Sequence, residues 1–78
     1  MNLEIITPEK KIYEGKVKSA VFHGSDGSFG VLDNHAPMVA NLVAGKVFLT
    51  EENNNKIDFA IKGGIVEVLK NNVIVLAV

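Results

Sequence analysis

Turn-forming residues interrupt the apolar segments of this chain every few residues, and this spacing is the strongest constraint on its fold. The interruptions include Pro8, Gly15, the glycine-rich stretch 24–28, the polar run 51–55 and the pair 63–64. The apolar segments between them are about four to seven residues long, which is typical of strands and short for helices. We therefore predict an all-β fold, arranged as a two-layer β-sandwich of about nine or ten short strands with no helical domain.

The expected strands cover most of the chain. Segment 38–42 is the one ambiguous stretch, because it fits a helical turn as well as an irregular strand. Asn71-Asn72 is a plausible two-residue hairpin turn, and Gly63-Gly64 indicates a bulge or a bend. The other expected strands are 3–6, 11–15, 16–22, 29–32, 46–50, 56–62, 65–69 and 73–77.

Alternation of apolar and polar residues predicts which side chains are buried. In segment 16–22, Val17, Ser19 and Val21 share one face and two lysines share the other, which is the pattern of a half-buried strand. Segment 73–77 is apolar on both faces, so we expect it to lie centrally in a sheet. The residues predicted to be buried are Val17, Val21, Phe29, Val47, Phe59, Val66 and Val75.

The stretch 24–37 is the densest in residues with special backbone demands. Gly24, Gly27 and Gly30 recur at every third position and allow positive φ, while the small polar residues between them can fix a turn. A phosphate-binding loop would need a helix N-terminus after the glycines, whereas a short apolar strand follows here. We therefore expect a tight turn between strands that can also serve as a docking surface, because loops carry contact residues on a rigid scaffold.

Composition excludes several classes of function. The chain is expected to form one domain, residues 1–78, and its formal net charge of −1 lacks the basic excess typical of nucleic-acid binding. No cysteine is present, which excludes disulfides and thiolate chemistry. No apolar run approaches the roughly 20 residues that span a bilayer. Any membrane contact is therefore expected to pass through a partner.

The two histidines, His23 and His35, are the main candidates for acid–base chemistry or metal ligation. A hydrolytic triad needs a nucleophile, a base and an orienting group that converge in a pocket, whereas the candidates here share one surface loop. Two histidines without cysteine also lack the four-ligand set of a structural zinc site. We predict no catalytic residue, no metal site and no cofactor. His35 is expected either to fix the turn before Pro37 or to contact a partner.

Small all-β carrier domains for biotin or lipoate are the main alternative class. They present one lysine at a hairpin tip, usually between methionines or within Asp-Lys-Ala. Lys62 precedes Gly63-Gly64, but neither of its neighbours matches these patterns. The residues alone therefore indicate a rigid module that binds other proteins.

Several motifs occur in the order found in one known family. Residues 24–37 read Gly-Ser-Asp-Gly-Ser-Phe-Gly-Val-Leu-Asp-Asn-His-Ala-Pro, and Leu42-x-x-Gly45 follows them. Residues 63–68 read Gly-Gly-Ile-Val-Glu-Val, and residues 72–77 read Asn-Val-Ile-Val-Leu-Ala. Together these motifs resemble the N-terminal β-sandwich domain of the bacterial F-type ATP synthase epsilon subunit over nearly the whole chain.

The resemblance implies a non-catalytic subunit of the rotor, on the central stalk of the proton-driven ATP synthase. Such a subunit docks on the gamma subunit and on the ring of c subunits, and it couples rotation of the ring to the shaft. The implied location is the cytoplasmic face of the bacterial inner membrane, where the subunit is a peripheral part of the complex. The isolated chain is expected to be a monomer.

Two sets of contact residues follow from the resemblance, position by position. In the family the ring-facing loops of c subunits carry an arginine, so a carboxylate is suited to the loop that meets them. The residues that match this c-ring loop are Ser25, Asp26, Gly27 and Ser28. The residues that match positions facing the gamma subunit are His35, Ala40 and Lys62.

Typical family members continue beyond the last strand into an α-helical hairpin that can block ATP hydrolysis or bind ATP. The sequence ends at Val78, directly after that strand. A chain of this length is expected neither to inhibit hydrolysis nor to bind ATP. The alternative is that the 78 residues are a domain excised from a longer chain.

Overall fold

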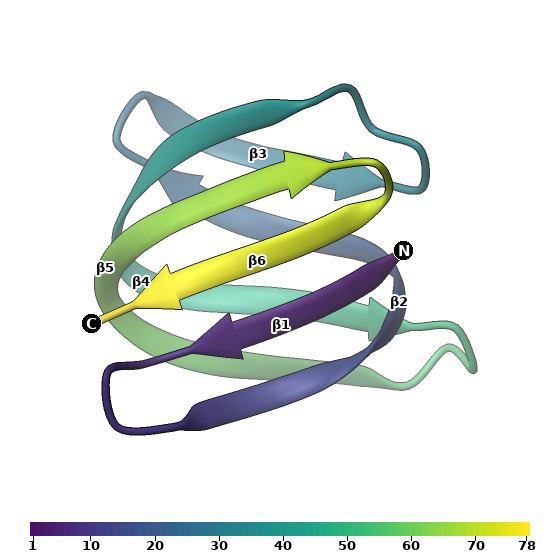
Figure 1. The fold of residues 1–78 in the computed structure, drawn as a ribbon, viewed down its shortest axis with the longest axis horizontal. Coiled ribbons are helices and arrows are strands. Elements are labelled where there is room, and N and C mark those ends of the chain that lie inside the picture. The colour runs from purple at the N-terminus through teal and green to yellow at the C-terminus, as the bar shows by residue number, and fades with distance from the viewer.

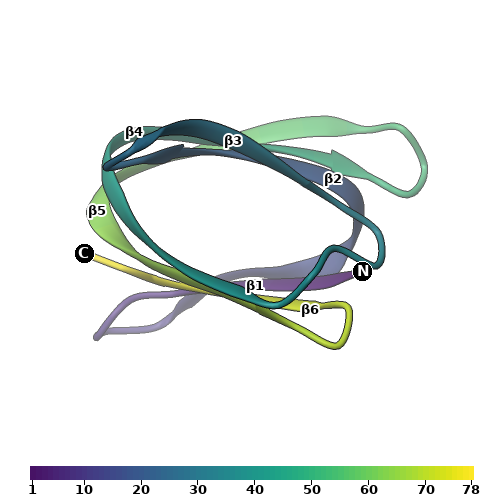
Figure 2. The same cartoon turned by 90° about the horizontal axis from the view of Figure 1, so that it is seen from above.

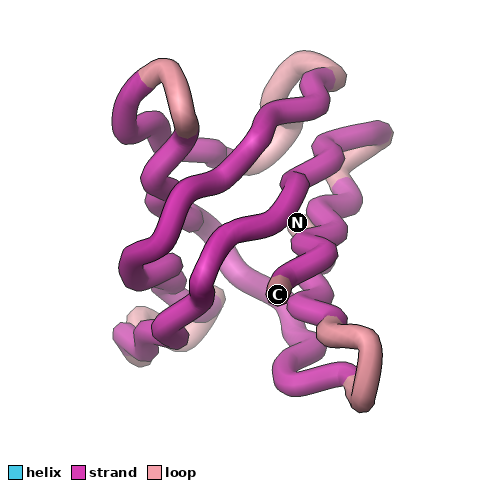
Figure 3. Tube along the Cα trace, turned by 90° about the vertical axis from the view of Figure 1, so that its left-hand side faces the viewer, coloured by secondary structure: helices cyan, strands magenta, loops and turns pink.

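The computed structural model describes all 78 residues, which form strands and connecting turns only. The six strands are β1 (Asn2–Ile6), β2 (Lys11–Gly24), β3 (Gly27–Leu32), β4 (Met38–Glu51), β5 (Lys56–Leu69) and β6 (Asn72–Ala77) (Figure 1). Every pairing is antiparallel except β1–β6, which is parallel. The predicted all-β class is confirmed, and the ambiguous segment 38–42 lies in a strand. None of the elements is a helix that could span a membrane (Figure 3).

Three strands of 14 residues each, β2, β4 and β5, bend and pass from one layer of the sandwich to the other (Figure 2). The β3 layer contains β3, the second halves of β2 and β4, and the first half of β5. The β1 layer contains β1, β6, the second half of β5, and the first halves of β2 and β4. Counted by layer there are nine strand segments, as expected from the sequence, but they join into six continuous strands.

Glycine allows the sharp bend of β5. Gly63 and Gly64 both have a φ of 150°, which residues with a side chain rarely adopt. A Cβ atom on Gly64 would lie 2.2 Å from the carbonyl oxygen of Leu76 in β6. The expected interruption at this pair is therefore a bend within one strand.

A register shift in β2 changes which of its residues face the core. The shift lies between Val17 and Ser19, where β2 has one residue more than its partner β4. Such a bulge reverses the alternation beyond it. Phe22 is therefore fully buried, whereas Val21 is 40% exposed. The prediction that Val21 is buried is wrong, because the period of two does not continue through the bulge.

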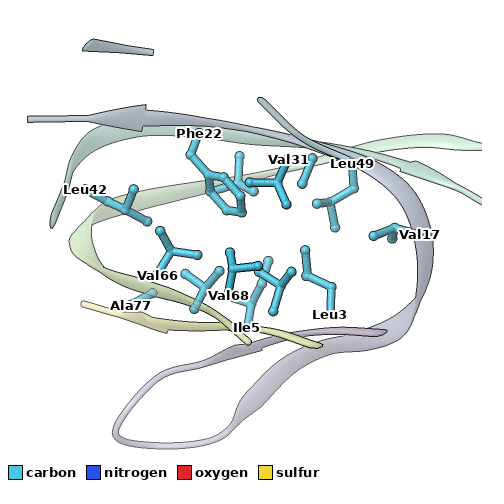
Figure 4. Packing of buried hydrophobic residues seen from close by; sticks show 14 of the residues in the cluster. Leu3, Ile5, Val17, Phe22, Val31, Leu42, Leu49, Val66, Val68 and Ala77 are labelled. Atoms are coloured by element: carbon cyan, nitrogen blue, oxygen red, sulfur yellow. The ribbon is translucent and has the colours of Figure 1, made fainter. Parts of the chain in front are cut away.

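The core lies between the two layers and is entirely apolar (Figure 4). Its side chains come from all six strands, and no buried side-chain nitrogen or oxygen lacks a hydrogen-bond partner. Phe29 and Phe59 were predicted to be buried but are only half-buried at the margin of this core. The predicted core residues that are fully enclosed are Val17, Val47, Val66 and Val75.

The last hairpin turn lies one position earlier than the sequence predicts. Lys70 and Asn71 form it, with φ values of 51° and 62°, and Asn72 already pairs with Leu69. Two successive positive φ values give a turn whose twist matches that of the flanking strands. The prediction of a turn at Asn71-Asn72 is therefore corrected to Lys70-Asn71.

The strands β1 and β3 lie end to end along the same edge of β2. β1 pairs with residues 11–16 of β2, and β3 pairs with residues 19–24. Where they meet, the buried α-ammonium group of Met1 donates to the carbonyl of Val17 (3.0 Å) and to the carboxylate of Asp33 (2.5 Å). This ion pair ties the start of β1 to the loop that follows β3.

Candidate protein-docking site

The turn between β2 and β3 carries four of the residues expected to contact a partner. Ser25 and Asp26 form the turn, and both are exposed, as are the two residues after them, Gly27 and Ser28. The amide of Ser25 donates to the carbonyl of Asn41 in β4 (3.0 Å). The turn therefore presents small polar groups and one carboxylate on a backbone that is fixed against β4.

At two of the three glycine positions in this stretch, the structure explains why a residue with a side chain would be unfavourable. A Cβ atom on Gly24 would lie 2.9 Å from Cε1 of Phe29, so glycine lets the ring pass beneath the turn. Gly27 has a φ of 122°, which glycine adopts without strain. Gly30 has no such need, because a Cβ atom there would approach only the carbonyl oxygen of Ala20, at 3.8 Å.

A groove of about 430 Å³ lies between this turn and the first half of β4; we call it the β3–β4 groove. The half-buried side chains of Phe29 and Met38 pack against the core, so the groove reaches the margin of the core. The exposed turn supplies its polar wall. The lining residues are Gly24, Ser25, Asp26, Gly27, Ser28, Phe29, Met38, Val39, Ala40 and Asn41.

The groove occupies one of two sides of the sandwich where the layers do not pair. On this β3–β4 side, the free edge of β3 faces the first half of β4. On the β2–β5 side, the first halves of β2 and β5 face each other, and the rings of Tyr13 and Phe59 meet with centroids 5.3 Å apart. The Tyr13 hydroxyl also donates to the carboxylate of Glu51 (2.6 Å). The β2–β5 side is thus closed by an aromatic pair and a hydrogen bond.

The contact between Tyr13 and Glu51 shifts the pKa values of both groups. Burial of the ring, together with the hydrogen bond to Glu51, raises the pKa of Tyr13 to about 12. The hydrogen bonds from Tyr13 and Asn55 lower the pKa of Glu51 below its ordinary value of 4.5. At neutral pH the phenol is therefore a neutral donor and the glutamate a charged acceptor, which strengthens the hydrogen bond between them.

Both histidines make local hydrogen bonds and do not gather with other reactive groups. Nδ1 of His23 lies 2.8 Å from Oγ of Ser28, and its ring meets Phe48 edge-on. Nδ1 of His35 lies 2.7 Å from the carbonyl oxygen of Ala36. No group of three His, Asp or Glu side chains lies close enough to hold a metal ion. His35 thus takes the turn-fixing geometry that was one of its two expected roles.

The three residues expected to face the gamma subunit lie at separate places. Ala40 lines the β3–β4 groove together with the turn. His35 lies in the loop at the other end of β3. Lys62 lies at the bend of β5, where its amide donates to the carbonyl of Val78 (3.1 Å). The structure therefore brings Ala40 to the turn residues but does not join all three into one patch.

The outer face of the β1 layer carries an apolar patch that sequence reasoning missed. Ile65 in β5 pairs with Leu76 in β6, and these side chains are 43% and 53% exposed. The sequence feature that indicates this patch is segment 73–77, which is apolar on both faces. This strand does lie centrally, between β1 and β5, but its outward side chains remain uncovered. The apolar members of the patch are Ile6, Val39, Ile65, Ile74 and Leu76.

The complete chain matches the sequence model of one protein family. The match covers residues 1–78, and the family is described as ATP synthase, Delta/Epsilon chain, beta-sandwich domain. The chain belongs to this family. The two-layer fold and the resemblance carried by the sequence motifs are thereby confirmed.

Relatives at about 40% identity are named ATP synthase epsilon chain. The protein of Leptospira borgpetersenii serovar Hardjo-bovis (strain JB197) is 42% identical over 76 residues, which cover 97% of this chain and 59% of that protein. The protein of Chlorobium limicola is 40% identical over 74 residues, which cover 95% of this chain and 84% of that protein. The chain therefore spans little more than half of the Leptospira relative.

Solved structures share the fold at lower identity. A chain in the cryo-EM structure of Euglena gracilis mitochondrial ATP synthase, OSCP/F1/c-ring, has a TM-score of 0.90 and 23% identity, and the match covers 96% of this chain and 48% of that chain. A chain in the cryo-EM structure of the central stalk and c-ring of Tetrahymena thermophila mitochondrial ATP synthase has a TM-score of 0.80 and 20% identity, covering 99% and 62%. At these identities the likeness establishes the fold alone.

Proposed function

We propose that this chain is a non-catalytic subunit of the central stalk of a proton-driven F-type ATP synthase and turns with its rotor. It docks on the gamma subunit and on the ring of c subunits, and it couples rotation of the ring to the shaft. The observation that carries this proposal is the match of all 78 residues to the ATP synthase delta/epsilon β-sandwich family. The proposed location is the cytoplasmic face of the bacterial inner membrane, as a peripheral part of the complex.

A subunit that transmits torque needs a stiff body, and the architecture of the sandwich suits this task. Backbone pairings run in a closed circuit through β1, β6, β5, β4 and β2 and return to β1. Inside this circuit, 16 apolar residues form one core. Close-packed interiors have low compressibility, so a load applied to one face reaches the other with little deformation.

The β2–β3 turn, Ser25–Ser28, is the proposed contact with the c ring. Its four residues are exposed, and Asp26 takes part in none of the ion pairs within the chain. A carboxylate without an internal partner remains available to a basic group on another protein, and such charge complementarity favours association. This supports the turn, and Asp26 in particular, as the surface that meets the arginine-bearing loops of the family's c ring.

The proposed gamma contacts are His35, Ala40 and Lys62. Ala40 lies in the β3–β4 groove beside the β2–β3 turn, so the two proposed docking surfaces adjoin there. His35 and Lys62 extend the gamma surface towards the loop after β3 and the bend of β5. The assignment predicts that gamma contacts this chain over several strands and not through one loop.

A charge reversal in the turn tests the c-ring contact. Asp26→Lys should weaken binding to purified c ring roughly tenfold at low salt, because a lysine there repels the basic ring loops, and less at high salt where surface charges are screened. Glu52→Lys is the matched control, since it makes the same charge change in the exposed β4–β5 turn. Unchanged ring binding by Asp26→Lys would exclude the turn as the contact. Wild-type chain that does not co-purify with gamma and c ring would contradict the proposed function itself.

Two other functions receive no support from the geometry. The glycine-rich turn leads into β3 and not into a helix N-terminus, so it lacks the amide cradle that binds phosphates. Lys62 lies within β5 and not at a hairpin tip, where a biotin or lipoate carrier presents its lysine. We accordingly propose that these residues transmit rotation and neither bind ATP nor inhibit hydrolysis. Measurable ATP binding in calorimetry, or suppressed hydrolysis on adding the chain to the complex, would contradict this.

A further inference from the structure

The outer edge of β3 has backbone groups that no other strand pairs with. Gly24 and Gly27 flank the two-residue turn and form its closing hydrogen-bonded pair. Because the direction of the backbone groups alternates along a strand, Ser28 and Gly30 point their N–H and C=O groups away from β2. The hydroxyl of Ser28 lies beside Nδ1 of His23 (2.8 Å) and so does not occupy these groups. Each of the two residues therefore offers one free donor and one free acceptor at this edge.

The β3 edge lacks the features that normally protect an edge strand. Its sequence, Gly-Ser-Phe-Gly-Val-Leu, contains no charged residue and no proline, and its pairing with β2 has no register shift. Natural edge strands usually carry charges, proline or bulges that prevent a further strand from pairing. The β3 edge is therefore open to an added strand, and Gly30 keeps its middle free of side-chain atoms.

The β3 strand of a second copy fits this edge in an antiparallel, two-fold arrangement centred on Phe29. In that register Ser28 of each copy lies opposite Gly30 of the other, and each of these pairs exchanges two N–H···O=C hydrogen bonds. All the free donors and acceptors of Ser28 and Gly30 are then satisfied. Phe29 lies opposite the same residue of the other copy as a non-hydrogen-bonded pair, with the two Cα atoms about 4.5 Å apart.

The same register covers an aromatic ring that the single chain leaves partly exposed. Phe29 is half-buried at the margin of the core and lines the β3–β4 groove. Across the two-fold axis the two rings meet on the same face of the sheet, where an aromatic pair stabilises two neighbouring strands. Backbone pairing and apolar burial therefore occur at one place.

Charge does not oppose the pairing of two copies. The chain has a formal net charge of −1, and proteins with a net charge near zero associate more readily than highly charged ones. In this register the two Asp26 carboxylates lie about 20 Å apart, beyond the screening length of about 8 Å at physiological salt. Asp33 follows Leu32, the residue opposite Asp26 of the other copy, and its carboxylate is already paired with the α-ammonium group of Met1. No unpaired like charges therefore face each other across the edge.

We propose that the free chain forms a weak, two-fold symmetric dimer in which the β3 edges of two copies pair antiparallel through Ser28 and Gly30. The occupant is a second copy because β3 itself supplies what this edge accepts: an extended, uncharged strand with matching outward groups and an aromatic ring at its centre. The dimer departs from the expectation, drawn from the family resemblance, that the isolated chain is a monomer. Since Ser28 also belongs to the proposed c-ring contact, pairing and ring binding exclude each other. The inference does not rest on the proposed function.

A matched pair of substitutions at Gly30 tests the edge. Gly30→Pro removes the outward N–H in both copies but leaves the β2–β3 ladder in place, because the Gly30 groups do not point towards β2. Gly30→Ala keeps the N–H, and its Cβ atom has room. Sedimentation equilibrium between about 10 µM and about 1 mM should show the mass of the wild-type chain rising from 8.4 kDa towards twice that value. We expect the proline variant to dimerise at least about tenfold more weakly and the alanine variant to stay within about twofold of wild type.

Amide hydrogen exchange on the wild-type chain tests the same contact without a substitution. It also decides the question if the proline variant fails to fold, which thermal unfolding followed by circular dichroism reveals. Raising the chain concentration over the same range should slow exchange of the Ser28 and Gly30 amides at least about fivefold. The amides of Phe29 and Val31 already pair with β2 and should change much less.

Three outcomes would overturn the dimer. A mass that stays at that of a single chain up to the highest concentration excludes self-association. A dimer that forms equally well with Gly30→Pro, or without slowing Ser28 and Gly30, is built on another surface. Slowing of these amides by purified gamma or c ring, in a chain that remains monomeric, assigns the edge to that other partner. None of these outcomes contradicts the proposed function, whose own test is co-purification with gamma and c ring.

Discussion

Tyr13 and Phe59 close the β2–β5 side of the sandwich, whereas Phe29 and Met38 leave a groove on the β3–β4 side. Both sides are bounded by unpaired strand edges and by half-buried apolar side chains. On the closed side the two rings meet at a centroid distance of 5.3 Å. On the other side the groove has a volume of about 430 Å³.

The two sides also differ in the hydrogen bonds that cross each of them. The closed side has the bond from Tyr13 to Glu51 (2.6 Å) and one from the amide of Glu52 to the carbonyl of Lys16 (3.3 Å). On the β3–β4 side, the bond from Ser25 to Asn41 holds the turn end of the groove. The β2–β5 side is therefore closed by contacts within the chain, whereas the β3–β4 side keeps an open groove, which is the side proposed for docking.

The largest effect is expected from removing the ring that closes the β2–β5 side. Phe59→Ala should lower the free energy of unfolding by about 2–3 kcal/mol, less than the loss for a fully enclosed phenylalanine because the ring is only half-buried. Urea denaturation followed by circular dichroism measures the loss. A loss below about 1 kcal/mol would mean that the aromatic pair contributes little to stability.

A smaller effect is expected from widening the groove on the other side. Met38→Ala should cost about 1 kcal/mol, because its side chain is already half-exposed and water can replace it. The same denaturation experiment applies, with Phe59→Ala as the reference. Equal losses for the two variants would remove the distinction between a stabilising side and a docking side.

The smallest effect on stability is expected from a change of pH, which acts through the hydrogen bond from Tyr13 to Glu51. Because the folded-state pKa of Tyr13 is about 12 against an ordinary 10.0, its contribution to stability is complete below pH 10 and is lost as the pH rises towards 12. The lowered pKa of Glu51 acts in the opposite range: its contribution is present above pH 4.5 and is lost as the pH falls through the folded-state pKa.

Ultraviolet titration can follow Tyr13 alone, because it is the only tyrosine and there is no tryptophan. Its ionisation should occur near pH 12 in the folded chain and near pH 10 in urea. Tyr13→Phe should remove the part of the alkaline loss of stability that comes from Tyr13 and reduce the acid loss. An ordinary pKa in the folded chain would show that the ring does not close the β2–β5 side in solution.

The sequence predicts the strand segments well because alternation and turn residues act locally. It also separates a bend from a chain reversal at two glycine sites. Gly63-Gly64, expected to be a bulge or a bend, bends β5 from one layer to the other, whereas Gly24 and Gly27 flank the expected reversal. The failure at Val21 arises because the bulge after Val17 depends on pairing with β4, which no local pattern encodes.

The candidate site is only partly visible in the sequence. Small polar residues beside glycines predict the exposed turn at Ser25 and Asp26. The groove beside it depends on β4 reaching the turn through the bond between Ser25 and Asn41, a contact set by the tertiary fold. The free edge of β3 likewise depends on the strand order. Only the topology shows that β3 is the last strand of the sheet and that no strand pairs with its outer edge.

The parallel pairing of β1 with β6 determines how the chain bears a pulling force. The N-terminus lies at the start of β1 and the C-terminus just after β6, at opposite ends of this pair (Figure 1). Tension between the two ends therefore slides the strands along each other and loads their hydrogen bonds together, instead of unzipping them one after another. Rupture in this shear geometry requires several bonds to break at once, so the parallel ladder acts as a mechanical clamp between the two ends of the chain.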